Sequence, residues 1–157
     1  MNLDSLSRKV GKTLKSKGQT LVTAESCTGG WVAQAVTSVA GSSDWFERGY
    51  ITYSNAAKRE ELGVAQGTLQ RHGAVSEATA RAMALGALRN GKGTLALAIT
   101  GVAGPSGGTP QKPVGMVCFA WAQGRKIRSE TMRFEGGRES VRRQSVIHAL
   151  RGILEWL

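Results

Sequence analysis

The chain has 157 residues and an ordinary apolar content of 41%, which suits one domain with its own hydrophobic core. No apolar run approaches the ~20 residues of a membrane-spanning helix, and the N-terminal segment lacks the apolar core of a signal peptide, so we expect a cytoplasmic protein with no membrane partner. The net charge of +10 favours anionic partners, namely nucleic acid, a membrane surface or phosphorylated small molecules, although a solvated basic face is an equally good interpretation.

The first third of the chain predicts a helix, a buried strand and a second helix. Apolar residues recur at helical spacing in residues 3–17, and Gly18 ends that run. Residues 19–24 have the short apolar pattern of a buried strand. Residues 29–41 again have a helical pattern, which Gly41 ends.

A second strand and two capped helices follow. Residues 49–54 are rich in β-branched and aromatic side chains, which predicts a strand. The next helix, residues 55–63, has a natural N-cap in Asn55 and a natural left-handed end in Gly63. Ser76 is the expected cap of a further helix, whose apolar residues form one stripe.

The C-terminal part predicts three strands and a long helix. Residues 94–100 form a continuous apolar strand of the kind covered on both faces, and a Gly- and Pro-rich loop follows at residues 101–113. Residues 114–122 and 126–134 are typical of an antiparallel pair, and residues 136–157 of a closing helix.

Helices that alternate with short apolar strands indicate an α/β fold. We predict that residues 1–157 form a single three-layer domain, with a mixed, mostly parallel sheet and helices on both faces. The apolar side of the last helix, Leu157 included, is expected to face the core. Trp45 and Phe46 look exposed, and we interpret them as an interface, a pocket wall or a plain surface turn.

Residues 23–30, TAESCTGG, join the first predicted strand to the helix after it. A Gly-rich turn at such a junction can present a nucleophile and backbone N–H groups to a small molecule, or it can be an ordinary tight turn. Ser26 is the candidate nucleophile. Backbone N–H groups of Thr28, Gly29 and Gly30 are the candidate donors to an oxyanion.

The histidines and cysteines give little support to other chemistry. His72, in a predicted loop, and His148 have no partner that the sequence identifies, so we favour structural roles for both. Cys27 and Cys118 lie far apart in the chain and fit free thiols in a reducing compartment. A Ser-His-Asp triad and a zinc site are therefore poorly supported, while Cys27 stays an alternative nucleophile.

Lysine is the remaining general base for Ser26. Lys58 lies in the first turn of a predicted helix, where the helix dipole and partial burial would lower the pKa of its ammonium group toward neutrality. The alternative is a surface lysine in a charged run. Tyr53 precedes Lys58 by five residues and is expected to orient the pair, or else to face the core.

Two further segments are candidates for binding. The loop that begins at Thr100 and Gly101 follows a buried strand, and ligands of α/β sheets bind beyond the carboxyl ends of strands, although a plain flexible loop would look similar. Arg142 and Arg143 lie one turn into the last helix, where a phosphate is well placed. The residues together predict a pocket with a Ser-Lys hydrolytic pair and an anion clamp.

Four ordered segments, residues 23–64, 72–88, 98–121 and 136–144, resemble the CinA C-terminal domain family, and within it the stand-alone nicotinamide-nucleotide amidohydrolases. The resemblance covers nearly the whole chain. It implies hydrolysis of nicotinamide mononucleotide to nicotinate mononucleotide and ammonia in pyridine-nucleotide salvage, with no metal and no cofactor.

The same resemblance assigns roles to single residues. It implies that Ser26 is the nucleophile, Lys58 the base and Tyr53 their helper. It places Thr100, with Gly101 beside it, and Arg142 rather than Arg143 among the active-site positions for the substrate.

The partner expected on this basis is a small pyridine nucleotide, and we also expect a homo-oligomer. Nucleic acid is not the expected primary ligand. The alternative function is a non-catalytic nucleotide- or nucleic-acid-binding accessory protein related to competence.

Overall fold

The computed structural model describes residues 2–156, so the prediction for Leu157 lies outside the described residues. Its elements are α1 (Leu3–Ser16), β1 (Leu21–Glu25), α2 (Trp31–Thr37), the 3₁₀ turn η1 (Ser42–Asp44), β2 (Phe46–Ile51), α3 (Asn55–Leu62), α4 (Gln66–His72), α5 (Glu77–Asn90), β3 (Leu95–Gly101), β4 (Met116–Gln123), β5 (Lys126–Arg133) and α6 (Arg138–Trp156). Within residues 2–156 no helix combines the length and the apolar character needed to cross a membrane.

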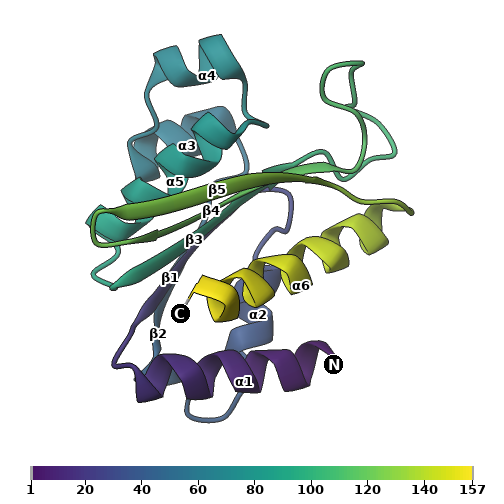
Figure 1. The fold of residues 1–157 in the computed structure, drawn as a ribbon. Coiled ribbons are helices and arrows are strands. Elements are labelled where there is room, and N and C mark those ends of the chain that lie inside the picture. Colours follow the sequence, from purple (N-terminus) through teal and green to yellow (C-terminus); the bar gives the residue numbers. More distant parts are fainter. Residues whose placement is uncertain (1, 157) are drawn as a thin grey trace.

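Five strands form one sheet in the order β2-β1-β3-β4-β5 (Figure 1). β1 pairs in parallel with both β2 and β3, whereas β4 pairs antiparallel with both β3 and β5. Four strands therefore run in one direction and only β4 is reversed. The predicted mixed, mostly parallel sheet and the predicted antiparallel pair near its end are both confirmed.

Helices cover both faces of this sheet, with α1, α2 and α6 on one side and α3, α4 and α5 on the other (Figure 1). Side chains alternate along a strand, so the two faces differ. In β3, Leu95 and Leu97 belong to the core beneath α1 and α6, while Ala96 and Ala98 belong to the core beneath α5. The small alanines leave room for α5 to approach the sheet. The predicted three-layer α/β architecture is confirmed.

The helix caps mostly follow the sequence. Ser76 Oγ accepts a hydrogen bond from Thr79 N at 3.0 Å and caps α5 as predicted, and Gly63 ends α3 in the left-handed region at φ +67°. The prediction for the start of α3 was wrong by one residue. Ser54, not Asn55, is its N-cap, because Ser54 has extended backbone and its Oγ accepts from Ala57 N at 3.0 Å.

The segment between α2 and β2 departs most from expectation. α2 ends at Thr37 rather than residue 41, and β2 begins at Phe46 rather than residue 49, since pairing with β1 decides where the strand starts. Trp45 was expected to be exposed, and this was wrong. Trp45 is only 3% exposed. A Cβ on Gly11 would lie 2.4 Å from the Trp45 ring, so the ring fits there only because residue 11 is glycine.

α4 was not predicted, and His72 is its last residue rather than part of a loop. Its short sequence has no apolar stripe, since Leu69 is its one buried side chain.

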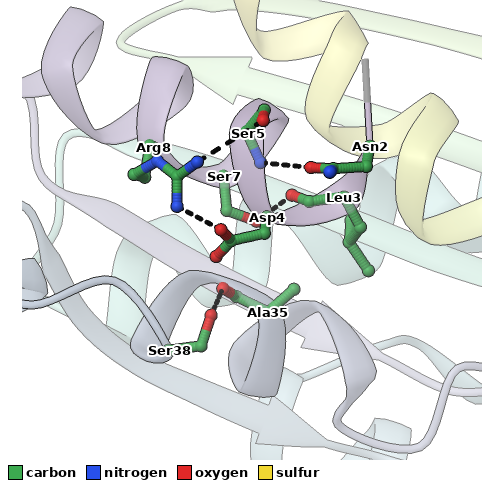
Figure 2. A network of polar contacts seen from close by, with 8 residues as sticks. All are labelled: Asn2, Leu3, Asp4, Ser5, Ser7, Arg8, Ala35 and Ser38. Carbon is green, nitrogen blue, oxygen red and sulfur yellow. Dashed lines mark hydrogen bonds and ion pairs between the residues drawn. The ribbon is translucent and has the colours of Figure 1, made fainter.

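The start of α1 is stabilised by local polar contacts, which Figure 2 shows from close by. Asn2 caps the helix by accepting a hydrogen bond from Ser5 N at 2.8 Å, and Arg8 pairs with Asp4 one turn earlier in the helix. α1 packs against α2, the helix that begins directly after the TAESCTGG turn.

Candidate active site

The turn at residues 26–30 lies at the carboxyl end of β1, beside the carboxyl end of β3. Glu25, the last residue of β1, is paired with Ile99 of β3. The next residues along the chain, Ser26 and Thr100, therefore lie at the adjacent carboxyl ends of these two strands. Ser26 N donates to Ile99 O at 3.0 Å, which ties the turn to β3. The edge predicted for ligand binding is therefore where the candidate nucleophile lies.

Lys58 brings its amine to Ser26 from α3. The distance from Lys58 Nζ to Ser26 Oγ is 3.0 Å, and the lysine side chain is only 1% exposed. Nζ also donates to two backbone carbonyls of the β2–α3 connection, Thr52 O at 2.8 Å and Tyr53 O at 3.1 Å. The alternative of a surface lysine is wrong, because α3 turns this residue inward.

Burial lowers the pKa of the Lys58 ammonium group below its ordinary value. Taking a charged amine out of water disfavours the charged form, and this outweighs the opposing effect of the nearby Cys27. Among residues 2–156 no carboxylate forms an ion pair with Lys58. The amine at this position therefore favours its neutral form more than an exposed lysine does.

A buried carboxylate braces the turn from the α2 side. Glu25 is 1% exposed and accepts hydrogen bonds from Thr28 Oγ1 at 2.6 Å, Val32 N at 2.9 Å and Ala33 N at 3.1 Å. It thereby satisfies two backbone donors in the first turn of α2 and places negative charge at the positive end of that helix. Glu25 thus ties the turn that carries Ser26 to the start of α2.

Arg142 braces the turn from the other side. Its Nε donates to Cys27 O at 3.1 Å and its second guanidinium nitrogen to Thr28 O at 3.2 Å, while the guanidinium lies over the ring of Trp31, 5.5 Å from the centroid. The side chain predicted to hold phosphate thus binds the backbone of the nucleophile turn. Arg143, its neighbour, is exposed.

A pocket of about 170 Å³ opens above the Ser26–Lys58 contact. Five of the predicted site residues line it: Ser26, Tyr53, Lys58, Thr100 and Gly101. Thr100 is held by a hydrogen bond from its Oγ1 to Ala74 O at 2.8 Å. The rest of the lining consists of small or apolar side chains, among them Ala74, Val75 and Ala103, and one charged side chain, Arg138.

Thr28, Gly29, Gly30 and Arg142 are not among the lining residues. The Gly29 N–H donates to Ser26 O at 3.0 Å inside the turn, so it is not free to donate into the pocket. The expectation that Gly29 serves as an oxyanion donor is therefore not met in this conformation. Gly29 and Gly30 instead supply the positive φ angles, +59° and +103°, that the turn requires.

Tyr53 contacts Lys58 through its backbone carbonyl and not through its phenol. The Tyr53 carbonyl accepts from Lys58, whereas the phenol oxygen accepts from Arg138 at 3.4 Å. The side chain is 63% exposed, so the alternative that it faces the core is wrong.

Cys27 lies beside Ser26 but is a poor nucleophile. Burial raises the pKa of its thiol to about 12, so the thiolate is scarce at neutral pH. The alternative of a cysteine nucleophile is therefore disfavoured by the structure.

Within residues 2–156 no group of three or more histidine, cysteine and acidic side chains is placed to hold a metal ion. His148 instead contacts Glu130, and its ring packs against Phe119 with centroids 4.6 Å apart, which fits the structural role favoured for it.

Sequence reasoning missed Arg138 and Glu25. Arg138 lines the pocket, and its only signal was its place in the GGRESVRRQ segment beside the more prominent Arg142. Glu25 was visible as an acidic residue at a strand end, a short turn before a predicted helix whose N-terminus favours negative charge.

Comparison with known proteins places this site in context. The family model described as the CinA C-terminal domain matches residues 3–157. The chain is 52% identical over 151 residues to the nicotinamide-nucleotide amidohydrolase PncC of Escherichia coli (strain K12), covering 94% of this chain and 90% of that protein. It is 48% identical over 153 residues to the PncC of Pseudomonas putida, covering 98% and 96%. Among solved structures, the competence/damage inducible protein CihA from Agrobacterium tumefaciens matches with a TM-score of 0.94 at 42% identity, covering 98% of this chain and 94% of that chain.

Proposed function

The chain belongs to the CinA C-terminal domain family, and on that premise we propose that it hydrolyses the carboxamide of nicotinamide mononucleotide, giving nicotinate mononucleotide and ammonia. The observation that carries the proposal is the 3.0 Å contact between Ser26 Oγ and the buried amine of Lys58. A hydroxyl that shares a hydrogen bond with a neutral amine has the arrangement of an activated nucleophile.

The contacts of Lys58 can accommodate the neutral amine that the proposal requires. Three oxygens surround Nζ, namely Thr52 O at 2.8 Å, Tyr53 O at 3.1 Å and Ser26 Oγ at 3.0 Å, and an ammonium group would donate to all three. A neutral amine has two N–H bonds for the carbonyls and one lone pair that can accept the Ser26 proton. The lowered pKa of Lys58 makes this neutral form easier to reach than in an exposed lysine.

The proposed reaction has two halves. Lys58 Nζ takes the proton of Ser26 as Oγ attacks the amide carbon, and a tetrahedral intermediate forms. The C–N bond then breaks while Lys58 returns the proton to the departing ammonia. Water, deprotonated by Lys58, attacks the acyl ester, and Ser26 leaves with its proton restored.

Oxyanion stabilisation is assigned to the turn at residues 26–30. Because Ser26 N donates to Ile99 O and Gly29 N to Ser26 O, the turn's remaining backbone donors in this proposal are the N–H groups of Cys27, Thr28 and Gly30, of which only Cys27 lines the pocket. No step in the scheme calls for a metal or a cofactor.

Location and assembly stay predictions. Cys27 and Cys118 are both buried free thiols, which supports a reducing compartment such as the cytoplasm. We also keep the homo-oligomer as a prediction.

The test is ammonia release from nicotinamide mononucleotide by two neighbouring variants. Ser26→Ala should lower kcat by at least ~10³-fold, because the nucleophile is lost while the fold stays intact. Cys27→Ser should keep ammonia release, and the wild-type activity should resist thiol alkylation, because the Cys27 thiol stays protonated.

Turnover by Ser26→Ala near the wild-type rate would exclude the serine mechanism. Absence of ammonia release from the wild-type protein, together with salt-dependent binding of duplex DNA, would favour the accessory-protein alternative.

A further inference from the structure

The pocket over Ser26 is too small for a whole nucleotide. Its volume is about 170 Å³, whereas sites that enclose a drug-sized ligand hold roughly 300–1,000 Å³. The flat pyridine carboxamide fits such a space and must reach Ser26 and Lys58 at the bottom. The ribose and its phosphate then extend outward through the mouth of the pocket.

Arg138 is the charged side chain at that mouth. It is the first residue of α6, it is exposed, and the two cationic side chains that line the pocket are Arg138 and Lys58. Lys58 is buried against Ser26 and cannot reach a group outside the pocket.

Two contacts hold Arg138 in place without using up its donors. One terminal nitrogen donates to Gly104 O at 2.8 Å and the other to the phenol oxygen of Tyr53 at 3.4 Å. A guanidinium has five N–H donors in a rigid fork, so several stay available, and this fork matches the oxygens of a phosphate.

Arg142 is committed elsewhere. Its guanidinium donates to Cys27 O and Thr28 O behind the nucleophile turn and packs over Trp31. Arg142 has as many unused N–H donors as Arg138, but it does not line the pocket, so the lining favours Arg138 for a phosphate at the mouth.

We propose that Arg138, oriented by Tyr53 and Gly104, binds the phosphate of the substrate, and that Arg142 is a positioning residue for the Ser26 turn. The inference rests on the proposed function, since it takes the carboxamide to be the group at Ser26. It makes Arg138 the residue by which the protein distinguishes a nucleotide from the corresponding nucleoside.

The experiment compares nicotinamide mononucleotide with nicotinamide riboside, which has the same ring and ribose but no phosphate. Arg138→Ala should raise KM for the mononucleotide about 10- to 100-fold, the range expected for losing charge-assisted hydrogen bonds, with kcat little changed. The riboside kinetics should stay as in the wild type. For the mononucleotide, the KM of Arg138→Lys should lie between those of the wild type and Arg138→Ala, because lysine keeps the charge but lacks the guanidinium fork.

Two variants serve as comparisons. Arg143→Ala removes a neighbouring exposed arginine outside the pocket lining and should leave both substrates unaffected. Arg142→Ala should lower kcat for both substrates by the same factor, because it loosens the turn that carries Ser26. An increase in KM confined to the mononucleotide in Arg142→Ala, or an equal loss for both substrates in Arg138→Ala, would overturn the assignment.

Binding to the Ser26→Ala variant separates this inference from the proposed function. By calorimetry, Ser26→Ala should bind the mononucleotide more tightly than the riboside, and adding Arg138→Ala should abolish the difference. If that pattern appears but the wild type releases no ammonia, the proposed reaction is wrong and the phosphate site stands. If Ser26→Ala binds both compounds equally, the phosphate site is wrong whatever the activity.

Discussion

The proposed chemistry of this site depends on one amine, that of Lys58, which lacks a carboxylate partner. Lys58 is almost fully buried, and its three polar contacts are two carbonyls and a hydroxyl, none of which carries negative charge. A carboxylate at the same distance would stabilise the ammonium form and raise the pKa. The uncharged groups around Lys58 thus support its proposed role as a base as much as its distance from Ser26 does.

The pH dependence of the reaction should report this lysine. Since burial lowers the pKa of Lys58, the active neutral form appears as pH rises through that lowered value, and kcat/KM should increase with pH and level off well below the ordinary lysine value of about 10.4. The measurement uses nicotinamide riboside, so that no substrate phosphate titrates.

Lys58→Met gives the matching control, because methionine fills a similar apolar volume without an amine. Its kcat should be at least ~10³-fold below wild type at every pH. Substantial turnover by Lys58→Met, or a wild-type profile that rises only near pH 10, would exclude Lys58 as the base.

At the scale of elements, the position of Lys58 depends on how closely α3 and α5 approach each other. Gly86 of α5 faces the backbone of Leu62 at the end of α3, and a Cβ on Gly86 would lie 1.9 Å from Leu62 O. The two helices can be this close only because residue 86 has no side chain. α3 also carries Lys58, so the same contact helps to set the distance from Lys58 to Ser26.

Gly86→Ala should therefore damage stability and activity together. Because the clash is with backbone, one helix must move, and we expect the free energy of unfolding to fall by about 1–3 kcal/mol and kcat to fall with it. Chemical denaturation and ammonia release measure the two effects.

Gly67→Ala in α4 is the matched control, since nothing lies within 4 Å of its added Cβ. It should keep wild-type kcat and raise stability by ~0.5–1 kcal/mol, because alanine is the better helix former. If Gly86→Ala and Gly67→Ala had the same stability and the same kcat, the close approach of α3 and α5 at Gly86 would not be what positions Lys58.

At the scale of the whole molecule, the candidate site is assembled within one chain. Ser26 follows β1, Thr100 lies in β3, Lys58 comes from α3 and Arg138 from α6, and the central position of β1 and β3 in the sheet brings them together. The two edge strands β2 and β5 are the parts of the sheet left open to another chain.

Activity per chain should consequently not change on dilution. If the protein forms the predicted homo-oligomer, its dissociation should leave the turnover number unaltered, because the residues of the proposed mechanism all come from one chain. Ammonia release measured alongside sedimentation over a wide range of protein concentration checks this. A loss of turnover that follows dissociation would mean that a partner copy completes the site.

Local patterns in the sequence predicted most of the elements and the chemistry of the candidate pair. Strand alternation, helical periodicity and caps such as Ser76 act over one or two turns of chain, so neighbouring residues are enough to reveal them. Ser26 and Lys58 were chosen from the residue types at a strand end and a helix start, and the structure places them in hydrogen-bond contact, while their roles stay predictions.

The tertiary structure alone decided which arginine lines the pocket, where the ring of Trp45 lies and that the Gly29 amide is used within the turn. Arg138 meets Tyr53 from 85 positions away, and Arg142 meets Cys27 from 115 positions away. Such contacts depend on the order of strands in the sheet and on the rotation of α6 about its axis, which long-range packing determines. A periodic pattern reports which side of a helix is apolar, but it does not report what lies opposite each polar residue.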